Sequence, residues 1–529
     1  MDMVPHLLSY LTFLPLVGVV LISLLPASQK RYFRLIALLF CASQVLLSGM
    51  LLVQFQTDSA QYQFIEKLDW ITFSLGNMGT VSIDYLVGID GISLPLILLT
   101  SVVMLIGVVS SWTIQKRERA YFSLYLLLTT SIMGCFVALD FFLFFLFFEF
   151  MLLPMYFLIG LWGGPQREYA SIKFFLYTLV GSLLILIVMI GLYLSVIDPY
   201  ESELTNSLVH TFDLRYMTDG QNYLPNSILS LSGEVNIFGI PSRMLAFWLL
   251  FIGFAIKLPI VPLHTWLPDA HVEAPTPVSV VLAGVLLKIG GYGLLRIAYP
   301  IFPDAAHEYA FVLALLGVIS IIYGGFNALA QNDLKKMIAY SSVSHMGFVV
   351  LGISSLTAEG VNGAVYQMVS HGVLSALLFL LVGVLYDRTH NRLIDNYRGL
   401  IGPMPLFTLI TGITFFASLG LPGFSGFVGE LFTLMGGFKS QAIPTWLAGL
   451  STLGIVLAAA YFLWTLQRLF FGKLWAKKLN DLPLLLDLTV REKWMLIPLV
   501  LLTLLLGIFP HFLFQLSDKT ASALLKIFE

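Results

Sequence analysis

Long apolar runs, separated by short polar connections, make up nearly the whole chain. A helix needs about 20 consecutive apolar residues to cross the hydrocarbon core of a bilayer. The pattern therefore predicts an all-α polytopic membrane protein with fourteen transmembrane helices. The expected helices cover residues 6–26, 33–55, 84–111, 120–139, 141–162, 170–197, 243–267, 276–299, 308–330, 333–355, 360–387, 403–439, 442–472 and 492–515.

The basic residues in the connections predict the orientation of the chain. Nineteen of the 28 Lys and Arg residues fall on one side of the membrane and seven on the other, while Lys257 and Lys288 lie inside apolar runs. Because basic connections stay in the cytoplasm, both termini and the polar insertion 198–242 are expected on the non-cytoplasmic side. We interpret the insertion as an exposed loop. The first apolar run lacks the basic flank of a cleavable signal, so it is expected to remain as a helix.

Proline and glycine interrupt two of the predicted helices, the seventh and the twelfth. Pro259 and Pro262 follow Lys257 in the seventh, and each proline removes an N–H donor and clashes with the preceding turn. The twelfth breaks in the glycine-rich segment 416–430, which ends at Glu430. Irregular backbone at membrane depth is tolerated only where it is buried in protein or lines a hydrated cavity. Both breaks therefore indicate an ion or proton site.

Interrupted helices at matching places in two halves are typical of transporters built from internal repeats. We expect one five-helix repeat in helices 4–8 and a second in helices 9–13, which gives Lys257 and Glu430 equivalent positions. The predicted division of the chain is 1–118 for helices 1–3, 119–299 for the first repeat, 300–472 for the second, and 473–529 for the last helix.

Three ionisable residues lie deep inside apolar runs. Glu149 is about nine residues into the fifth helix, or roughly 13 Å at 1.5 Å per residue. Lys288 is about ten residues into the eighth helix, too deep to snorkel to an interface. Intramembrane charges are usually functional, so Glu149, Lys257 and Lys288 are candidate proton carriers. Lys257 is the expected partner of Glu149, and the alternative for this pair is a static ion pair that fastens two helices.

Histidines and further carboxylates extend this set. His345 and His371 lie among serines on neighbouring apolar helices, a setting that suits proton relay near neutral pH; the alternative is a buried histidine that only satisfies a hydrogen bond. His264 either joins the relay or pins the broken helix. Three residues, either an uptake funnel or a solvated turn, are expected at the cytoplasmic mouth: Asp269, His271 and Glu273.

The amino-acid composition limits the kinds of chemistry that this chain can perform. The chain is 58% hydrophobic and 11% charged, against about 25% charged residues in soluble domains. A net charge of −2 predicts no nucleic-acid partner. Cys41 and Cys135 stand in separate apolar runs, whereas iron–sulfur and structural zinc sites need clustered ligands. The sequence therefore predicts no metal and no redox centre in this chain, and its chemistry is expected to be ion movement.

Two segments resemble a known family. HTWLPDAHVEAPTPVSVVLAGVLLKIGGYGLLR (264–296) and DLKKMIAYSSVSHMG (333–347) are similar to the antiporter-like membrane subunits of respiratory complex I, most closely the subunit M (chain 4) type. The resemblance runs from about Tyr85 to Phe471. It implies two inverted repeats and a charged axis along the membrane midplane. By motif, the proton-transfer positions of that axis are Glu149, Lys257, Lys288 and Glu430, and the glutamate at the last position is typical of this type.

The resemblance also implies a function and partners. The expected role is proton translocation by a non-redox subunit of NADH:quinone oxidoreductase, driven by quinone reduction elsewhere in the complex. FMN, iron–sulfur clusters and quinone are then expected in partner subunits. The expected neighbours are subunits of the L (chain 5) and N (chain 2) types, with the lateral helix of the former, in a bacterial inner membrane or an organellar one. A subunit of a multisubunit Na⁺(K⁺)/H⁺ antiporter, or of a membrane-bound hydrogenase, is the alternative.

Overall fold

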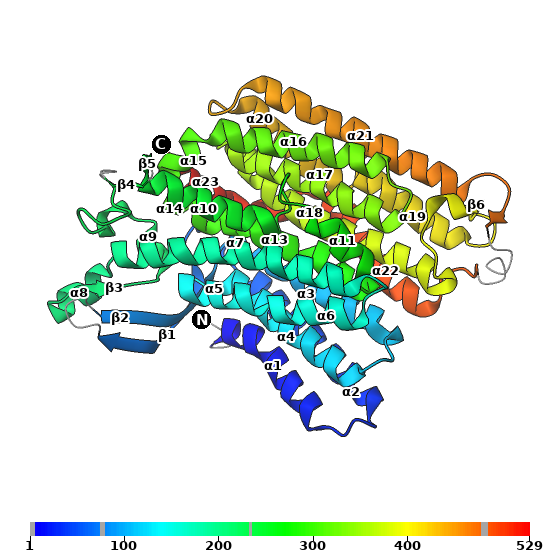
Figure 1. The fold of residues 1–529 in the computed structure, drawn as a ribbon, viewed down its shortest axis with the longest axis horizontal. Coiled ribbons are helices and arrows are strands. Elements are labelled where there is room, and N and C mark those ends of the chain that lie inside the picture. The colour runs from blue at the N-terminus through cyan, green and yellow to red at the C-terminus, as the bar shows by residue number, and fades with distance from the viewer. Residues whose placement is uncertain (1–5, 75–79, 232–234, 238, 478–484, 529) are drawn as a thin grey trace.

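A computed structural model describes residues 6–74, 80–231, 235–237, 239–477 and 485–528. Most of its long helices run side by side along one direction, which is close to horizontal in Figure 1. The helices before the first break are α1 (Leu7–Leu24), α2 (Lys30–Gln54), α3 (Ser93–Ser110), α4 (Glu118–Val137), α5 (Phe141–Phe150), α6 (Leu152–Trp162), α7 (Arg167–Ser195), α8 (Pro199–Thr205), α9 (Leu214–Met217) and α10 (Ser242–Lys257). The remaining helices are α11 (Trp266–Glu273), α12 (Thr276–Val281), α13 (Leu287–Gly293), α14 (Tyr299–Ile301), α15 (Pro303–Glu308), α16 (Ala310–Leu329), α17 (Leu334–Ser354), α18 (Ala358–Thr389), α19 (Pro405–Ser418), α20 (Ser425–Lys439), α21 (Thr445–Phe470), α22 (Val490–Ile508) and α23 (His511–Leu525).

The predicted all-helical membrane architecture is confirmed, with 11 or 12 candidate spans in the described residues against the fourteen helices predicted. Within the described residues, 11 helices are long and apolar enough to cross a membrane, and α22 with α23, bent by 65°, gives a twelfth span. The two other predicted helices, 243–267 and 403–439, are each divided at a break, into α10 with α11 and α19 with α20. The last span is sharply bent where a single helix, 492–515, was predicted.

Both predicted breaks are present, and their local chemistry explains them. Helix α10 ends at Lys257, just before Pro259 and Pro262, and the chain becomes helical again at Trp266. Helix α19 ends at Ser418, and Gly420 then adopts a φ of +81°, which glycine accepts without a Cβ clash. The breaks lie in the two halves of the chain at the places that the repeat predicts.

The prediction that a helix begins at residue 84 and continues to 111 is wrong in its first part. Residues 80–89 form strand β2 (Thr80–Ile89), which pairs antiparallel with β1 (Gln63–Ser74), and helix α3 begins only at Ser93. Threonine, valine, isoleucine and tyrosine in β2 favour strands, and Asp90 then accepts hydrogen bonds from the free N–H groups of Ile92 and Ser93. The apolar run therefore contains a strand, a turn and a shorter helix.

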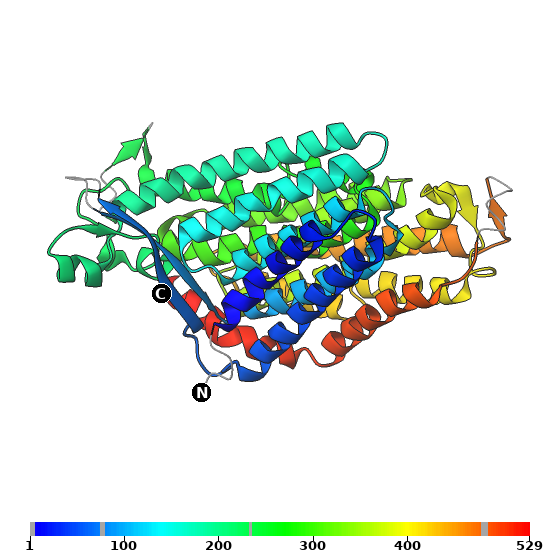
Figure 2. The same ribbon diagram turned by 90° about the horizontal axis from the view of Figure 1, so that it is seen from below.

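The insertion 198–242 is more structured than the predicted exposed loop. It contains α8, α9 and three short strands, β3 (Val209–His210), β4 (Asn236–Ile237) and β5 (Ile240–Pro241). Strand β3 extends the β1–β2 hairpin through parallel pairing with β2, and the segment around Phe212 is buried. Figures 1 and 2 place the insertion, the hairpin and both chain ends at the same end of the bundle.

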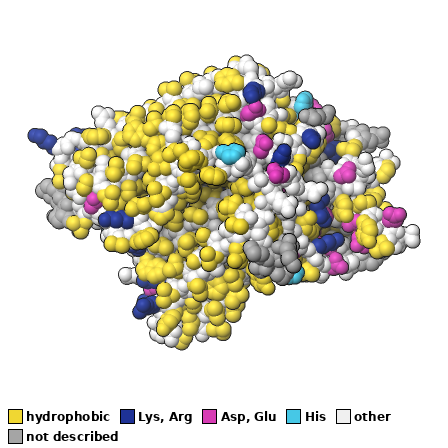
Figure 3. Space-filling model, turned by 180° about the vertical axis from the view of Figure 1, so that it is seen from behind, with side chains coloured by type: hydrophobic (Ala, Val, Ile, Leu, Met, Phe, Trp, Pro, Cys, Tyr) yellow, Lys and Arg dark blue, Asp and Glu magenta, His cyan; other side chains and the backbone are white. Residues whose placement is uncertain are grey.

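Charged side chains gather at the two ends of the bundle, and an apolar surface lies between them (Figure 3). On the face shown, Lys and Arg dominate the left end, while Asp and Glu gather towards the right end, which corresponds to the left of Figure 1. Asp140 and Asp333 cap the N-termini of α5 and α17, because each carboxylate accepts hydrogen bonds from N–H groups in the first turn of its helix.

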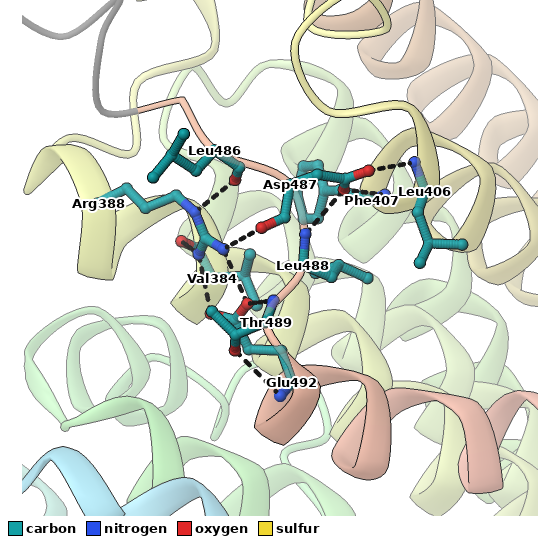
Figure 4. Close-up of polar contacts among 9 residues, drawn as sticks. All are labelled: Val384, Arg388, Leu406, Phe407, Leu486, Asp487, Leu488, Thr489 and Glu492. Carbon is teal, nitrogen blue, oxygen red and sulfur yellow. Dashed lines mark hydrogen bonds and ion pairs between the residues drawn. The ribbon is translucent and has the colours of Figure 1, made fainter.

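A polar clasp fastens three helices at the end of the bundle opposite the chain termini (Figure 4). Arg388, in the last turn of α18, forms an ion pair with Glu492 of α22 at 2.8 Å and donates to the carbonyl oxygens of Leu486 and Asp487. The Asp487 carboxylate accepts from the backbone N–H groups of Leu406 and Phe407, so it caps the N-terminus of α19. Nearby, β6 (Tyr397–Arg398) pairs with β7 (Trp475–Ala476). The clasp fixes where the interrupted helix α19 begins.

Candidate functional site

Lys288 is completely buried near the middle of the crossing Thr276–Ile301. Two π-helical turns, Leu282–Leu286 and Leu294–Ala298, flank it in this crossing, and such turns are frequent at functional sites. The Lys288 Nζ donates to the carbonyl oxygen of Ala283, in the first of these turns, at 2.5 Å. Gly290 lets α10 pack closely, since a Cβ there would lie 2.7 Å from the Phe254 carbonyl oxygen.

Lys288, His371, His345 and Glu430 form a row of polar side chains from three different helices and the central crossing. The Lys288 Nζ lies 2.8 Å from the Nδ1 of His371 on α18. The rings of His371 and His345, on α17, have their centroids 5.5 Å apart. The His345 Nδ1 in turn lies 3.1 Å from the Glu430 Oε1 on α20. The structure therefore brings together four of the site residues that the sequence suggests.

A cavity of about 10 Å³ lies beside this row, between α17, α18 and the break before α20. This volume suffices for about one water molecule. Ser418 Oγ, Gln367 Oε1 and Glu430 Oε2 are buried there without a hydrogen-bond partner in the described part of the chain. Buried polar atoms are normally paired with protein or with ordered water, so the cavity can hold a water beside His345 and Glu430.

Lys257 is buried but is not in an ion pair with Glu149. Its Nζ donates to the carbonyl oxygen of Phe148 at 3.1 Å, lies 3.2 Å from the Met151 Sδ, and stands 3.4 Å from the centroid of the Phe148 ring. A cation over an aromatic face is stabilised electrostatically. Glu149 is only half-buried and lies next to the short break between α5 and α6. The predicted direct contact between the two side chains is therefore absent from this conformation.

The candidate uptake residues occupy different environments. Asp269 forms an ion pair with Lys173 at 2.6 Å. Glu273 lines a cavity of about 210 Å³ at the end of the bundle that holds the polar clasp, and its Oε2 accepts from the backbone N–H of Gln166. His271 is fully buried beneath this end, stacked on Phe379 at 4.3 Å, with both ring nitrogens unpartnered in the described part of the chain.

His264 lies in the break itself. Its ring packs edge-on against Tyr323 at 5.2 Å, and its Nδ1 has no hydrogen-bond partner in the residues that the structure covers. No contact joins it to the row of Lys288 and His371. This placement fits the alternative in which His264 holds the broken helix in place.

Sequence reasoning missed three buried cations, because it assigned them to connections. Lys335 is buried and donates to the Ala274 carbonyl oxygen at 2.5 Å, beside the 210 Å³ cavity. Arg243 forms an ion pair with Asp304 at 2.9 Å. Arg296 pairs with Asp90 at 2.6 Å. Each lies at the edge of an apolar run, where a residue count alone does not separate a solvated connection from a buried helix end.

An apolar helix bundle that holds two interrupted helices, and a buried row of lysine, histidine and glutamate between them, defines an antiporter-like ion-translocating membrane subunit. Comparison with known proteins supports this class. Residues 138–456 match the family described as NADH:quinone oxidoreductase/Mrp antiporter, TM. The NADH-quinone oxidoreductase subunit M of Rhodobacter capsulatus is 41% identical over 526 residues, which cover 98% of this chain and 96% of the relative.

Solved structures agree with the sequence comparison. A chain of respiratory complex I from Thermus thermophilus matches with a TM-score of 0.81 and 30% identity, over 99% of this chain and 100% of that chain. A chain of the Mrp complex from Dietzia sp. DQ12-45-1b has a TM-score of 0.79 at 20% identity, over 98% of each chain, which shows the shared fold alone. The chain therefore belongs to the M-subunit family of NADH-quinone oxidoreductases. It is a multi-pass, proton-translocating membrane subunit of complex I.

Proposed function

We propose that protons move along the row from Lys288 through His371 and His345 to Glu430. The observation that carries this proposal is the row of neighbouring side chains: Lys288 lies 2.8 Å from His371, His345 lies 3.1 Å from Glu430, and the two histidine rings stand 5.5 Å apart between these contacts. A charged Lys288 donates a hydrogen bond to the neutral imidazole of His371, and the same geometry allows the proton to transfer. The water-sized cavity, which both histidines and Glu430 line, can hold a water that bridges His371 and His345.

Glu430 is the acceptor at the end of this row. Its Oε1 faces His345, while its Oε2 is unpartnered and faces the break at Gly420. The carboxylate can therefore take a proton from one side and release it on the other, where the interrupted helix leaves room for solvent. Neutralisation of Glu430 weakens its attraction for a charged His345, so arrival of a proton prepares the row for the next transfer.

Lys257 acts on this row through its charge. No described polar contact connects its Nζ with Lys288, although their helices, α10 and α13, pack directly on each other at Gly290. A cation on Lys257 disfavours a second cation on Lys288 and so promotes proton transfer towards His371. A charged Glu149 opposes this effect when the α5–α6 junction brings it closer to Lys257. The effect of Lys257 on Lys288 therefore depends on the distance between Glu149 and Lys257, which makes this pair a switch.

Proton uptake is assigned to the 210 Å³ cavity that Glu273 and Lys335 line. His271 lies below the cavity, and its two free ring nitrogens can accept and donate a proton towards Lys288. Asp269 is held in its ion pair with Lys173 outside this cavity. It is therefore part of the surface around the uptake route and not a step in it.

The basic end of the bundle is assigned to the cytoplasmic side, with both termini and the 198–242 insertion opposite it. Within complex I, the proposed neighbours are the homologous L-type and N-type subunits and the lateral helix of the former. FMN, iron–sulfur clusters and quinone are assigned to partner subunits. The chain's own part is proton movement, and H⁺ is preferred over Na⁺ because two imidazole groups, which serve as proton shuttles, stand in the middle of the row.

The test compares Glu430→Gln with Glu430→Asp in membranes in which the assembled complex is equally abundant. Glutamine keeps the shape of the side chain but cannot carry a proton, so pumping is expected to fall by about tenfold or more, whereas aspartate retains much of it. Glu359→Gln, at an exposed ion pair with Lys439, is the matched control. The proposal is refuted if the Gln variant pumps at the control rate, or if pumping by the native complex needs Na⁺.

A further inference from the structure

A third cavity, of about 680 Å³, opens at the end of α21 and has no part in the proton row. Three cations, Arg398, Arg468 and Lys473, line it together with one carboxylate, Asp395. Asp395 is occupied by an ion pair with the Arg468 NH1 at 3.1 Å. The cavity therefore has an excess of two positive charges in a protein whose net charge is −2.

The cavity is a built site with a fixed frame. Strands β6 and β7 pair Arg398 with Trp475 across it, and the backbone N–H groups of Leu400 and Ile401 donate to the last carbonyl oxygens of α21. The guanidinium of Arg468 stacks on Trp464 at 4.0 Å, and that of Arg398 lies 6.0 Å from the centroid of Trp475. These contacts hold the two guanidinium groups in place.

Arg468 has a donor that nothing in the described protein satisfies. Its Nε is buried without a hydrogen-bond partner, and arginine prefers planar recognition of carboxylate and phosphate groups. Buried polar groups are normally hydrogen-bonded. The aromatic and carboxylate neighbours therefore orient the Arg468 guanidinium but leave one of its donors without a partner in the described residues, as expected for a residue that binds an anion.

The position of the cavity along α21, relative to the membrane interface, indicates the source of that anion. Trp464 lies one turn, about 6 Å, before Arg468, and α21 ends at Phe470. Tryptophan towards the hydrocarbon and cations towards water is the arrangement of a membrane interface. Helix α21 lies at the outer edge of the molecule in Figure 1. The exposed side chains that continue from Trp464 along α21 are apolar, namely Leu450, Leu453, Val456 and Leu463.

We propose that this cavity binds the phosphate headgroup of an anionic phospholipid. Arg398, Arg468 and Lys473 contact the phosphate, and the acyl chains lie along the apolar side chains of α21. Basic pockets beside membrane helices favour anionic headgroups. A free phosphate ion shares the headgroup chemistry but not the apolar contacts, and a neighbouring protein subunit would instead cover the cations with carboxylates.

The experiment counts the lipids that the purified full-length chain retains in detergent, by native mass spectrometry after incubation with phosphatidylglycerol or phosphatidylcholine. Phosphatidylglycerol is expected to bind in preference. Each cation contributes about fivefold to the binding of an anionic lipid, so the triple variant Arg398→Gln, Arg468→Gln and Lys473→Gln is expected to weaken binding by on the order of 100-fold. A control triple variant at the same end, Arg31→Gln, Lys336→Gln and Lys493→Gln, removes equal charge outside the cavity and is expected to bind normally.

Four results would overturn the proposal. Equal retention of the two lipids would exclude headgroup recognition, and an equal loss in both triple variants would reduce the effect to overall charge. Displacement of the lipid by millimolar inorganic phosphate would identify a site for the free ion. The same count on the assembled complex gives the last comparison: loss of the lipid there shows that a partner subunit occupies the cavity and refutes the assignment, while its retention supports the assignment.

Discussion

Asp90→Asn is expected to destabilise the protein by about 3 kcal/mol, although residue 90 is remote from the proton row. Asp90 and Arg296 are both buried, and the Arg296 NH2 lies 2.6 Å from the Asp90 Oδ1. Removing one partner of a buried pair leaves an uncompensated charge, which costs about 3–5 kcal/mol. Arg296 keeps two other acceptors, the hydroxyl groups of Tyr292 at 3.1 Å and Tyr62 at 2.8 Å, so the lower end of that range applies.

Asparagine is chosen because it preserves the second role of residue 90, which is to cap the start of α3. The Asp90 Oδ1 also accepts from the backbone N–H groups of Ile92 and Ser93 at 3.0 Å each. Asparagine caps a helix about as well as aspartate. The loss of stability in Asp90→Asn therefore measures the ion pair, whereas Asp90→Ala is expected to lose about 1 kcal/mol more with the cap.

The assay is equilibrium unfolding of the purified chain in detergent, with Asp58→Asn in an exposed turn as the control. The double variant Asp90→Asn with Arg296→Gln removes both charges and is expected to recover much of the loss, since residues in contact do not act additively. A difference below about 1 kcal/mol between Asp90→Asn and the control, or strictly additive effects in the double variant, would show that the pair does not hold the crossing in place.

Three further predictions concern residues outside the membrane-spanning segments. Burial, with the carboxylates of Asp84 and Asp213 nearby, raises the pKa of Asp140 to about 7. The folded protein then keeps a proton that the unfolded chain releases near pH 4, so stability falls as the pH rises from about 4 to 7. Asp140→Asn keeps the helix cap but cannot titrate. Its melting temperatures at pH 5 and pH 8 are therefore expected to differ less than those of the native protein. Ser207→Cys, in the exposed part of the insertion, is expected to react with an impermeant thiol reagent in intact cells but not in sealed inverted vesicles; because both native cysteines are buried, labelling from the cytoplasmic face alone would reverse the assigned topology. Asp487→Ala removes the carboxylate that accepts from Leu406 and Phe407 at the start of α19 and is expected to cost about 1 kcal/mol, and unchanged unfolding would show that the clasp does not stabilise this helix.

Apolar length predicted the helical bundle well, because a crossing needs a fixed number of apolar residues whatever its neighbours are. The same criterion failed at Thr80–Ile89, where a strand and a helix share one apolar run. Proline and glycine located both breaks, since their backbone restrictions act locally. The π-helical turns around Lys288 left no comparable signal in the sequence.

The structure brings together four of the candidate residues that the sequence suggests, but not all of the expected contacts are present. Lys288, His371, His345 and Glu430 were expected from charge within apolar runs, and the structure places them in one row. The expected contact of Glu149 with Lys257 is absent, because side-chain direction within a helix decides which residue a buried lysine reaches. Phe148, one position away, lies over Lys257 instead.

The two interrupted helices carry opposite charges at equivalent positions, and their surroundings differ accordingly. Glu430 contacts the ionisable His345 directly, so its charge can change when a proton arrives along the row. Lys257 contacts an aromatic ring, a carbonyl oxygen and a sulfur atom, none of which takes up or releases a proton near neutral pH. Its charge can therefore change only if water or Glu149 reaches it. In the proposed mechanism the second half of the chain transfers the proton, and the α5–α6 junction beside Lys257 determines when it does so.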